Sequence, residues 1–214
     1  MFISRATSPC TFNHVIARTL LVVVRLWITL AVVPTLAQQA HIDSTKSNVT
    51  VHVFKSGLFS GFAHDHVIQA PIASGSIDSD DKSVTLTFNV VDMKVLDPGA
   101  SDSERKDIDA TMKGPKVLDG TQFPVISFTA NSAKLSGTDR HEVTGTLKIH
   151  GVSRQITAPV TFHDEKYSGS LTLKQTDYRI TPVKIAGGTV RVKDEITIEF
   201  EVVPASAATH GATH

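Results

Sequence analysis

Apolar and polar residues alternate along most of the chain beyond residue 46, with the period of two that marks a β-strand with one buried face. Clusters of turn-forming residues at 79–82, 136–139, 150–151 and 163–165 interrupt the alternation. The strands delimited in this way are 47–55, 66–78, 83–93, 124–135, 142–150, 154–163, 166–174 and 190–203. Short connections and regular spacing predict an all-β fold of about eight antiparallel strands, closed as a barrel or folded as a sandwich.

One segment, 101–113, has helical rather than alternating character. Ser101 or Ser103 can cap its start, because a serine hydroxyl accepts a hydrogen bond from the free backbone N–H groups of a first helical turn. Ile108 and Met112 are four residues apart and therefore fall on one face. We expect a short helix inserted between strands, lying across the sheet or over one end of a barrel.

The beginning of the chain has the features of an export signal. Three arginines precede or interrupt an apolar stretch, and small residues up to Ala37 precede two glutamines. The uninterrupted apolar run covers only residues 26–33, far short of the roughly 20 residues that span a bilayer. The pattern predicts a secretory signal over residues 1–37, cleaved near Ala37, and a periplasmic or secreted protein with no transmembrane anchor in the mature chain.

The remaining chain is expected to form one domain over residues 38–204, followed by a disordered tail over 205–214. Without the three arginines of the signal it has 18 basic and 21 acidic residues, a net charge of −3. This balance does not favour a nucleic-acid-binding surface. The single cysteine, Cys10, lies in the signal, so the mature protein has no disulfide, no thiolate metal site and no cysteine nucleophile.

The segment Gly145–Arg154 reads GTLKIHGVSR and resembles the signature strand and turn of the YceI-like family. Four other segments resemble family segments in the same order: His41–Leu58, Gln122–Phe128, Thr176–Ile180 and Val192–Ile196. The resemblance implies an extended, lipocalin-like barrel of eight antiparallel strands with a short helical insertion. It also implies an exported bacterial protein that holds a long apolar ligand, such as a polyisoprenoid or fatty-acyl chain, inside the barrel.

The chain departs from the family pattern at three places. In the family, the helical insertion carries a short motif that includes a histidine. This chain lacks that histidine, and Arg105 and Met112 stand near the positions of the motif. The family's D-F-G turn is replaced by residues 177–179, Asp-Tyr-Arg, and a plain polar turn is replaced by residues 64–66, His-Asp-His. We therefore expect the recognition of a ligand head group to differ from that in other members.

The polar candidates are His64, His66, Arg105 and Arg154, which we expect at the mouth of the barrel, where they can bind the polar head of a ligand. An alternative is that His64 and His66, which share one face of a strand, supply two ligands to a zinc or copper ion. That alternative needs a third ligand from elsewhere in the chain, and the pair alone is a weak signal. A purely structural role, in which the histidines cap loop carbonyls, also stays open.

The bulky apolar candidates are expected to line the interior: Phe54, Leu58, Phe62, Phe88, Met93, Met112, Phe128, Leu147, Phe162 and Leu171. The same residues can fill a solid core, and sequence does not distinguish a filled interior from a hollow one. No catalytic motif is recognisable, so we do not expect an enzyme.

We expect an exported protein that binds an amphiphilic lipid for transport, storage or sequestration, with no other cofactor. The alternatives are a periplasmic metal- or haem-associated protein using His64 and His66, and a solid-core stress-related scaffold. A homodimer is left open.

Overall fold

The computed structural model describes residues 39–56, 65–78, 83–185 and 190–205. All of them belong to one compact unit, Leu36–His214. The predicted signal over 1–37, nearly all of the predicted tail, and the candidates Leu58, Phe62 and His64 lie outside the described residues.

The described residues form twelve strands, one α-helix and two 3₁₀-helices. The strands are β1 (Gln39–His41), β2 (Asn48–Ser56), β3 (His66–Gln69), β4 (Ser74–Asp78), β5 (Ser83–Asn89), β6 (Lys94–Val95), β7 (Val125–Leu135), β8 (Arg140–Ile149), β9 (Val152–His163), β10 (Lys166–Lys174), β11 (Lys184–Ile185) and β12 (Val190–Val202). The helices are α1 (Asp102–Lys113), η2 (Val90–Asp92) and η3 (Gln175–Tyr178).

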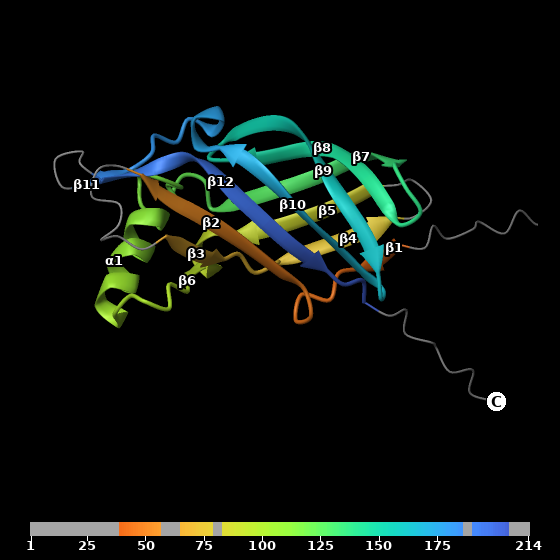
Figure 1. The fold of residues 1–214 in the computed structure, drawn as a ribbon, viewed down its shortest axis with the longest axis horizontal. Helices are drawn as coiled ribbons and strands as arrows, with labels where there is room; N and C mark the ends of the chain where they lie inside the picture. The colour runs from red at the N-terminus through yellow and green to blue at the C-terminus, as the bar shows by residue number, and fades with distance from the viewer. Residues whose placement is uncertain (1–38, 57–64, 79–82, 186–189, 206–214) are drawn as a thin grey trace, which may run out of the picture. The chain divides into compact units, whose positions relative to one another are not determined.

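All strands belong to one antiparallel sheet with the order β1-β4-β5-β7-β8-β9-β10-β12-β2-β3-β6, and β11 pairs with β12. β3 and β4 follow each other along the chain, yet β3 pairs with β2 and β4 pairs with β5. These pairings bring the two flanks of the sheet together, so the sheet curls round on itself (Figure 1). The predicted all-β class with an antiparallel sheet and one inserted helix is confirmed.

The strand count is higher than the predicted eight because one predicted strand is divided in two and because three short strands, β1, β6 and β11, were not predicted. The segment predicted as 66–78 breaks between β3 and β4, where Pro71 has no N–H to give to a ladder. On either side of the break, Ala70 N donates to Val49 O and Ala73 N donates to Thr87 O. The break is therefore a corner at which the strand changes neighbours. The segment predicted as 83–93 ends instead at Asn89, where η2 begins.

The helix α1 starts and ends as its sequence predicts. Ser101 is the N-cap, and its hydroxyl accepts a hydrogen bond from Glu104 N while the Glu104 carboxylate accepts one from Ser101 N, which is a reciprocal capping box. Met112 is buried, and the helix ends before Gly114. No helix among the described residues is both long enough and apolar enough to cross a membrane.

Candidate functional site: a cavity inside the curled sheet

The inner face of the curled sheet encloses a cavity of about 620 Å³. Strand alternation builds its wall, because every second residue points inward. On β2 the inward residues are Val49, Val51 and Val53, and on β12 Ile196 and Ile198 are among them. The volume is within the range of about 300–1,000 Å³ that is usual for ligand sites, so the interior of this sheet is hollow rather than solid.

Seven of the ten apolar candidates line this cavity: Phe88, Met93, Met112, Phe128, Leu147, Phe162 and Leu171. They come from β5, β7, β8, β9, β10 and α1, and from the residue that follows η2. The helix lies at one end of the curled sheet (Figure 1) and contributes to the wall of the cavity through Met112.

Phe54 differs from the expectation, because it is not among the residues that line the cavity. Its neighbour Val53 faces inward, so alternation turns Phe54 to the outer face of β2. There the Lys193 ammonium lies 5.7 Å from the centroid of the Phe54 ring, a distance at which a cation is attracted to the face of an aromatic ring.

The cavity extends between two ends of the sheet. At one end it is lined by Met112, Leu118 and Tyr178, from α1, the turn after it and η3. At the other end it is lined by Leu135 and Phe162, near the β7–β8 and β9–β10 connections. Leu135 is 69% exposed and Phe162 is 38% exposed, so these two side chains form an apolar rim where the cavity meets solvent.

Few polar residues line the cavity: Asp78, Ser83, His141, Lys174 and Gln175, besides the tyrosines Tyr167 and Tyr178. None of these polar residues was predicted as a site residue, because the alternating pattern and side-chain size single out large apolar residues instead. An interior of this kind favours an apolar molecule, since its binding is driven by removal of apolar surface from water.

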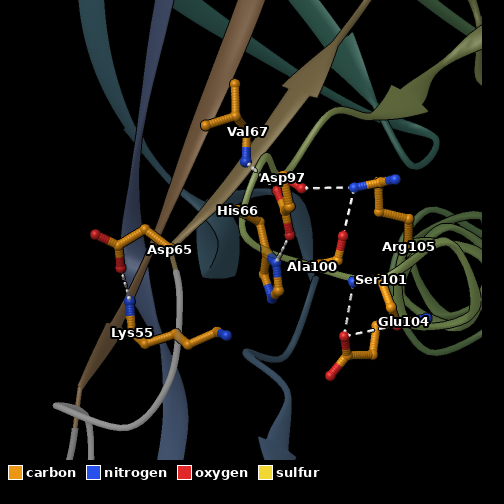
Figure 2. Close-up of polar contacts among 9 residues, drawn as sticks. All are labelled: Lys55, Asp65, His66, Val67, Asp97, Ala100, Ser101, Glu104 and Arg105. Carbon is orange, nitrogen blue, oxygen red and sulfur yellow. Dashed lines mark hydrogen bonds and ion pairs between the residues drawn. The ribbon is translucent and has the colours of Figure 1, made fainter.

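His66 pairs with a buried carboxylate (Figure 2). His66 Nδ1 lies 2.5 Å from Oδ2 of Asp97, and Val67 N donates to Oδ1 of the same carboxylate at 2.7 Å. Asp97 is only 1% exposed. A charge buried this deeply is stable only when it is paired and hydrogen-bonded, so the pair ties the start of β3 to the segment before α1.

Arg105 stabilises the same segment from the helix side (Figure 2). Its Nη1 donates to the carbonyl oxygen of Asp97 at 3.0 Å and to that of Ala100 at 2.5 Å, and its Nη2 donates to Asp102. Lys55 lies nearby, and partial burial lowers the pKa of its ammonium. The carboxylates of Asp97, Asp65 and Glu104 partly offset this effect.

Arg154 lies on the surface, where its Nε donates to the carbonyl oxygen of Asp177 at 3.0 Å. None of the three described polar candidates, His66, Arg105 and Arg154, lines the cavity, in contrast to the expectation of a polar mouth. Each has protein partners that a sequence pattern does not reveal: a carboxylate for His66 and backbone carbonyls for the two arginines.

The metal hypothesis stays a prediction. Within the part of the chain that the structure describes, no three histidine, cysteine or acidic residues come together as a metal would need. His64, the partner that the hypothesis requires, lies outside that part.

Tyr178 carries a hydroxyl without a hydrogen-bond partner among the described residues. The residue is 2% exposed, and its Oη is fully buried. Burial raises the pKa of the phenol to about 12 from an ordinary value of 10.0, with a further contribution from the charge of Asp177, while Arg154 opposes the rise. The hydroxyl is therefore a neutral, unpaired donor, a group whose burial costs about 1–3 kcal/mol.

Replacing Tyr178 with phenylalanine is expected to change how stability depends on pH. The pKa of the phenol is higher in the folded chain than in the unfolded one, so the unfolded state loses its proton first as pH rises. The free energy of unfolding of the wild type should therefore fall between about pH 10 and pH 12 more steeply than that of Tyr178→Phe. Urea unfolding at intervals from pH 8 to pH 12 measures the difference between the two proteins.

Tyr167→Phe provides the matched control, because Tyr167 also lines the cavity but is not among the buried unpaired groups. At pH 8 the Tyr178→Phe variant should equal or exceed the wild type in stability, by up to about 1 kcal/mol, since it removes an unsatisfied hydroxyl. Parallel curves for the wild type and Tyr178→Phe across the whole range would contradict the assignment.

Comparison with known proteins gives a matching family model and several similar solved structures. The family model of the YceI-like domain matches residues 41–203. Among solved structures, BcnA of Burkholderia cenocepacia is 21% identical, with a TM-score of 0.55 over 75% of this chain and 98% of that chain. A YceI protein of Campylobacter jejuni is 16% identical, with a TM-score of 0.45 over 72% of this chain and 85% of that chain.

A search of curated proteins finds no match. The likeness to BcnA bears on the fold, and the family assignment rests on the domain model, which spans the curled sheet from β1 to the end of β12. The chain belongs to the YceI-like family.

Proposed function

We propose that this protein binds one long apolar chain, isoprenoid-like or fatty-acyl, inside the curled sheet, and that it carries, stores or sequesters that lipid. The observation that supports the proposal is the cavity of about 620 Å³, whose wall is almost entirely aliphatic and aromatic. Each CH₂ group buried there contributes about 0.8 kcal/mol, so a chain of ten or more carbons can bind tightly with few polar contacts.

Family membership supports the same class of function, because the YceI-like resemblance implies a container for a polyisoprenoid-like ligand. The proposal includes export: cleavage near Ala37 would place the protein in the periplasm or outside the cell. It is a proposal of binding, not of catalysis. A solid-core scaffold is less well supported, since such a role does not need the hollow interior.

Native mass spectrometry tests the proposal directly. The full chain is expressed, purified without detergent and measured before and after extraction with organic solvent. We expect an adduct of a few hundred daltons that disappears on extraction, and an extracted chain that takes up added farnesol with a stoichiometry of one. A protein that arrives without lipid and takes up neither farnesol nor a C16 fatty alcohol would contradict the proposed function.

A further inference from the structure

A second concavity, of about 570 Å³, is lined by residues around β11. β11 lies at one end of the curled sheet (Figure 1). The concavity is formed by the end of β10, by β11, by the start of β12, by the end of β2 at Ser56 and by the residues between η3 and β11. Four basic residues line it, Lys174, Lys184, Arg191 and Lys193, and we call it the basic groove. Lys174 lines both the basic groove and the apolar cavity, so the two spaces share a wall.

The charges of the basic groove are not balanced within the described residues. Only two acidic residues, Asp194 and Glu195, line it against the four basic ones. Asp194 is hydrogen-bonded to η3, because its carboxylate accepts hydrogen bonds from Thr176 N at 2.9 Å and from Thr176 Oγ1 at 2.7 Å. These bonds, and the nearby Lys174, lower the pKa of Asp194. Among the ion pairs of the described residues, none involves any of the four basic groups. Lys174 has Glu195 as its cross-strand partner and the Lys193 ammonium lies over the Phe54 ring, so Lys184 and Arg191 are the two basic groups without a described partner of this kind.

Two of these basic groups stand directly opposite each other. Lys184 on β11 is the cross-strand partner of Arg191 on β12. Like charges in this position oppose strand pairing, and β11 consists of only two residues. Positions at which the residue type works against its own strand are often functional or strained sites.

An irregularity of β12 shapes the floor of the groove. Val192 pairs with Lys55 and Ile196 with Val53, so three residues, 193–195, lie opposite the single residue Phe54. Bulges of this kind re-aim side chains and are frequent next to binding sites. The displaced strand is held by η3, where Gln175 Nε2 donates to the carbonyl oxygen of Lys193 at 2.8 Å.

From this arrangement we infer that the basic groove binds an anionic head group, a phosphate or a carboxylate, of a ligand whose apolar chain occupies the cavity across Lys174. The inference rests on the proposed function and narrows it to a single-chain amphiphile that is negatively charged. Lysine and arginine side chains donate charge-assisted hydrogen bonds to phosphate and carboxylate oxygens, and an anion between Lys184 and Arg191 removes their mutual repulsion. The cavity alone has no comparable counter-charge, since Lys174 is its one basic lining residue apart from His141 among those described.

Two ligands with the same chain and different heads test the inference: farnesyl monophosphate and farnesol, titrated calorimetrically into the full chain below their micellar concentrations. The variant is Lys184→Gln/Arg191→Gln. We expect its affinity for farnesyl monophosphate to be about tenfold weaker than that of the wild type, since each partly exposed ion pair contributes modestly. Its affinity for farnesol should stay within about twofold, which also shows that the variant is folded. Raising the salt concentration should weaken the binding of farnesyl monophosphate and leave the binding of farnesol unchanged.

The matched control is Lys134→Gln/Lys148→Gln, which removes two exposed positive charges from β7 and β8, outside the basic groove. It should bind both ligands like the wild type. Equal affinities of the Lys184→Gln/Arg191→Gln variant and the wild type for farnesyl monophosphate, or equal losses in the two double variants, would overturn the inference.

Inorganic phosphate distinguishes a lipid head group from a free anion. We expect it to compete with farnesyl monophosphate only at concentrations at least a hundredfold higher, because it lacks the buried chain. Competition at similar concentrations would overturn the inference in favour of a free-anion site. If the wild type binds farnesol and the phosphate equally well, the groove inference fails and the proposed function stands. If it binds neither, the proposed function fails.

Discussion

The substitution Ala158→Phe is expected to weaken the binding of a long apolar ligand by tenfold or more while leaving the free energy of unfolding close to that of the wild type. Ala158 lies on β9, is buried, and lines the cavity. A phenylalanine ring at this position projects into the hollow interior, where it displaces at least two CH₂ groups of the ligand. At about 0.8 kcal/mol for each CH₂ group, this loss corresponds to at least tenfold in affinity.

The stability of the same variant distinguishes a hollow interior from a solid one. Inserting a large side chain into a filled core usually costs about 1–3 kcal/mol or more, whereas a ring that enters an empty cavity gains contacts. Titration with farnesol and unfolding in urea are the two measurements. Gln155→Phe, which adds the same ring to an exposed position of β9, is the control and should bind normally. A strongly destabilised Ala158→Phe protein would indicate a solid core, and an unchanged affinity would place the ligand elsewhere.

Removing the carboxylate of Asp97 is expected to cost about 3 kcal/mol of stability, the largest single effect among the described polar residues. In Asp97→Ala, Val67 N loses its acceptor and His66 Nδ1 loses its partner, both in a part-buried setting. Breaking a buried pair by deleting one member typically costs about 3–5 kcal/mol, because the remaining group is left unsatisfied. Chemical denaturation followed by circular dichroism measures the change.

A double-mutant cycle with His66→Ala assigns this cost to the pair. The two substitutions together should destabilise the protein by clearly less than the sum of the single effects, since both remove the same interaction. Asp92→Ala is the control: Asp92 is exposed and accepts one hydrogen bond, from Asn89, so its loss should cost no more than about 0.5 kcal/mol. Equal costs at Asp92 and Asp97, or strictly additive effects in the cycle, would contradict the role given to the pair.

The fold was largely predictable because its signals are local. Alternation in segments such as 142–150 needs only the two faces of a strand, and the capping box of α1 needs only Ser101 and Glu104. The corner at 70–73 was missed although Pro71 is visible in the sequence. Its meaning depends on which strands lie on either side, and that is a property of the curled sheet and not of the segment.

The polar features of the site were not predictable, because their partners are distant in sequence. His66 meets Asp97, which is 31 residues away, so a motif search centred on residues 64–66 finds the histidine without its carboxylate. Lys184 and Arg191 are ordinary surface residues until β11 and β12 place them opposite each other. The hollow interior is also not a local property, since it depends on how side chains from opposite walls fail to meet.

The exposed rim of Leu135 and Phe162 determines what kind of selectivity the cavity can exercise. A pocket that is closed at its far end excludes any chain that is longer than the pocket is deep. A passage that reaches solvent between two apolar side chains accepts a longer chain, whose end can protrude into solvent. Affinity should then rise with chain length until the chain reaches the rim and level off beyond it. Such a protein would select its ligand by what the head carries and not by how long the tail is.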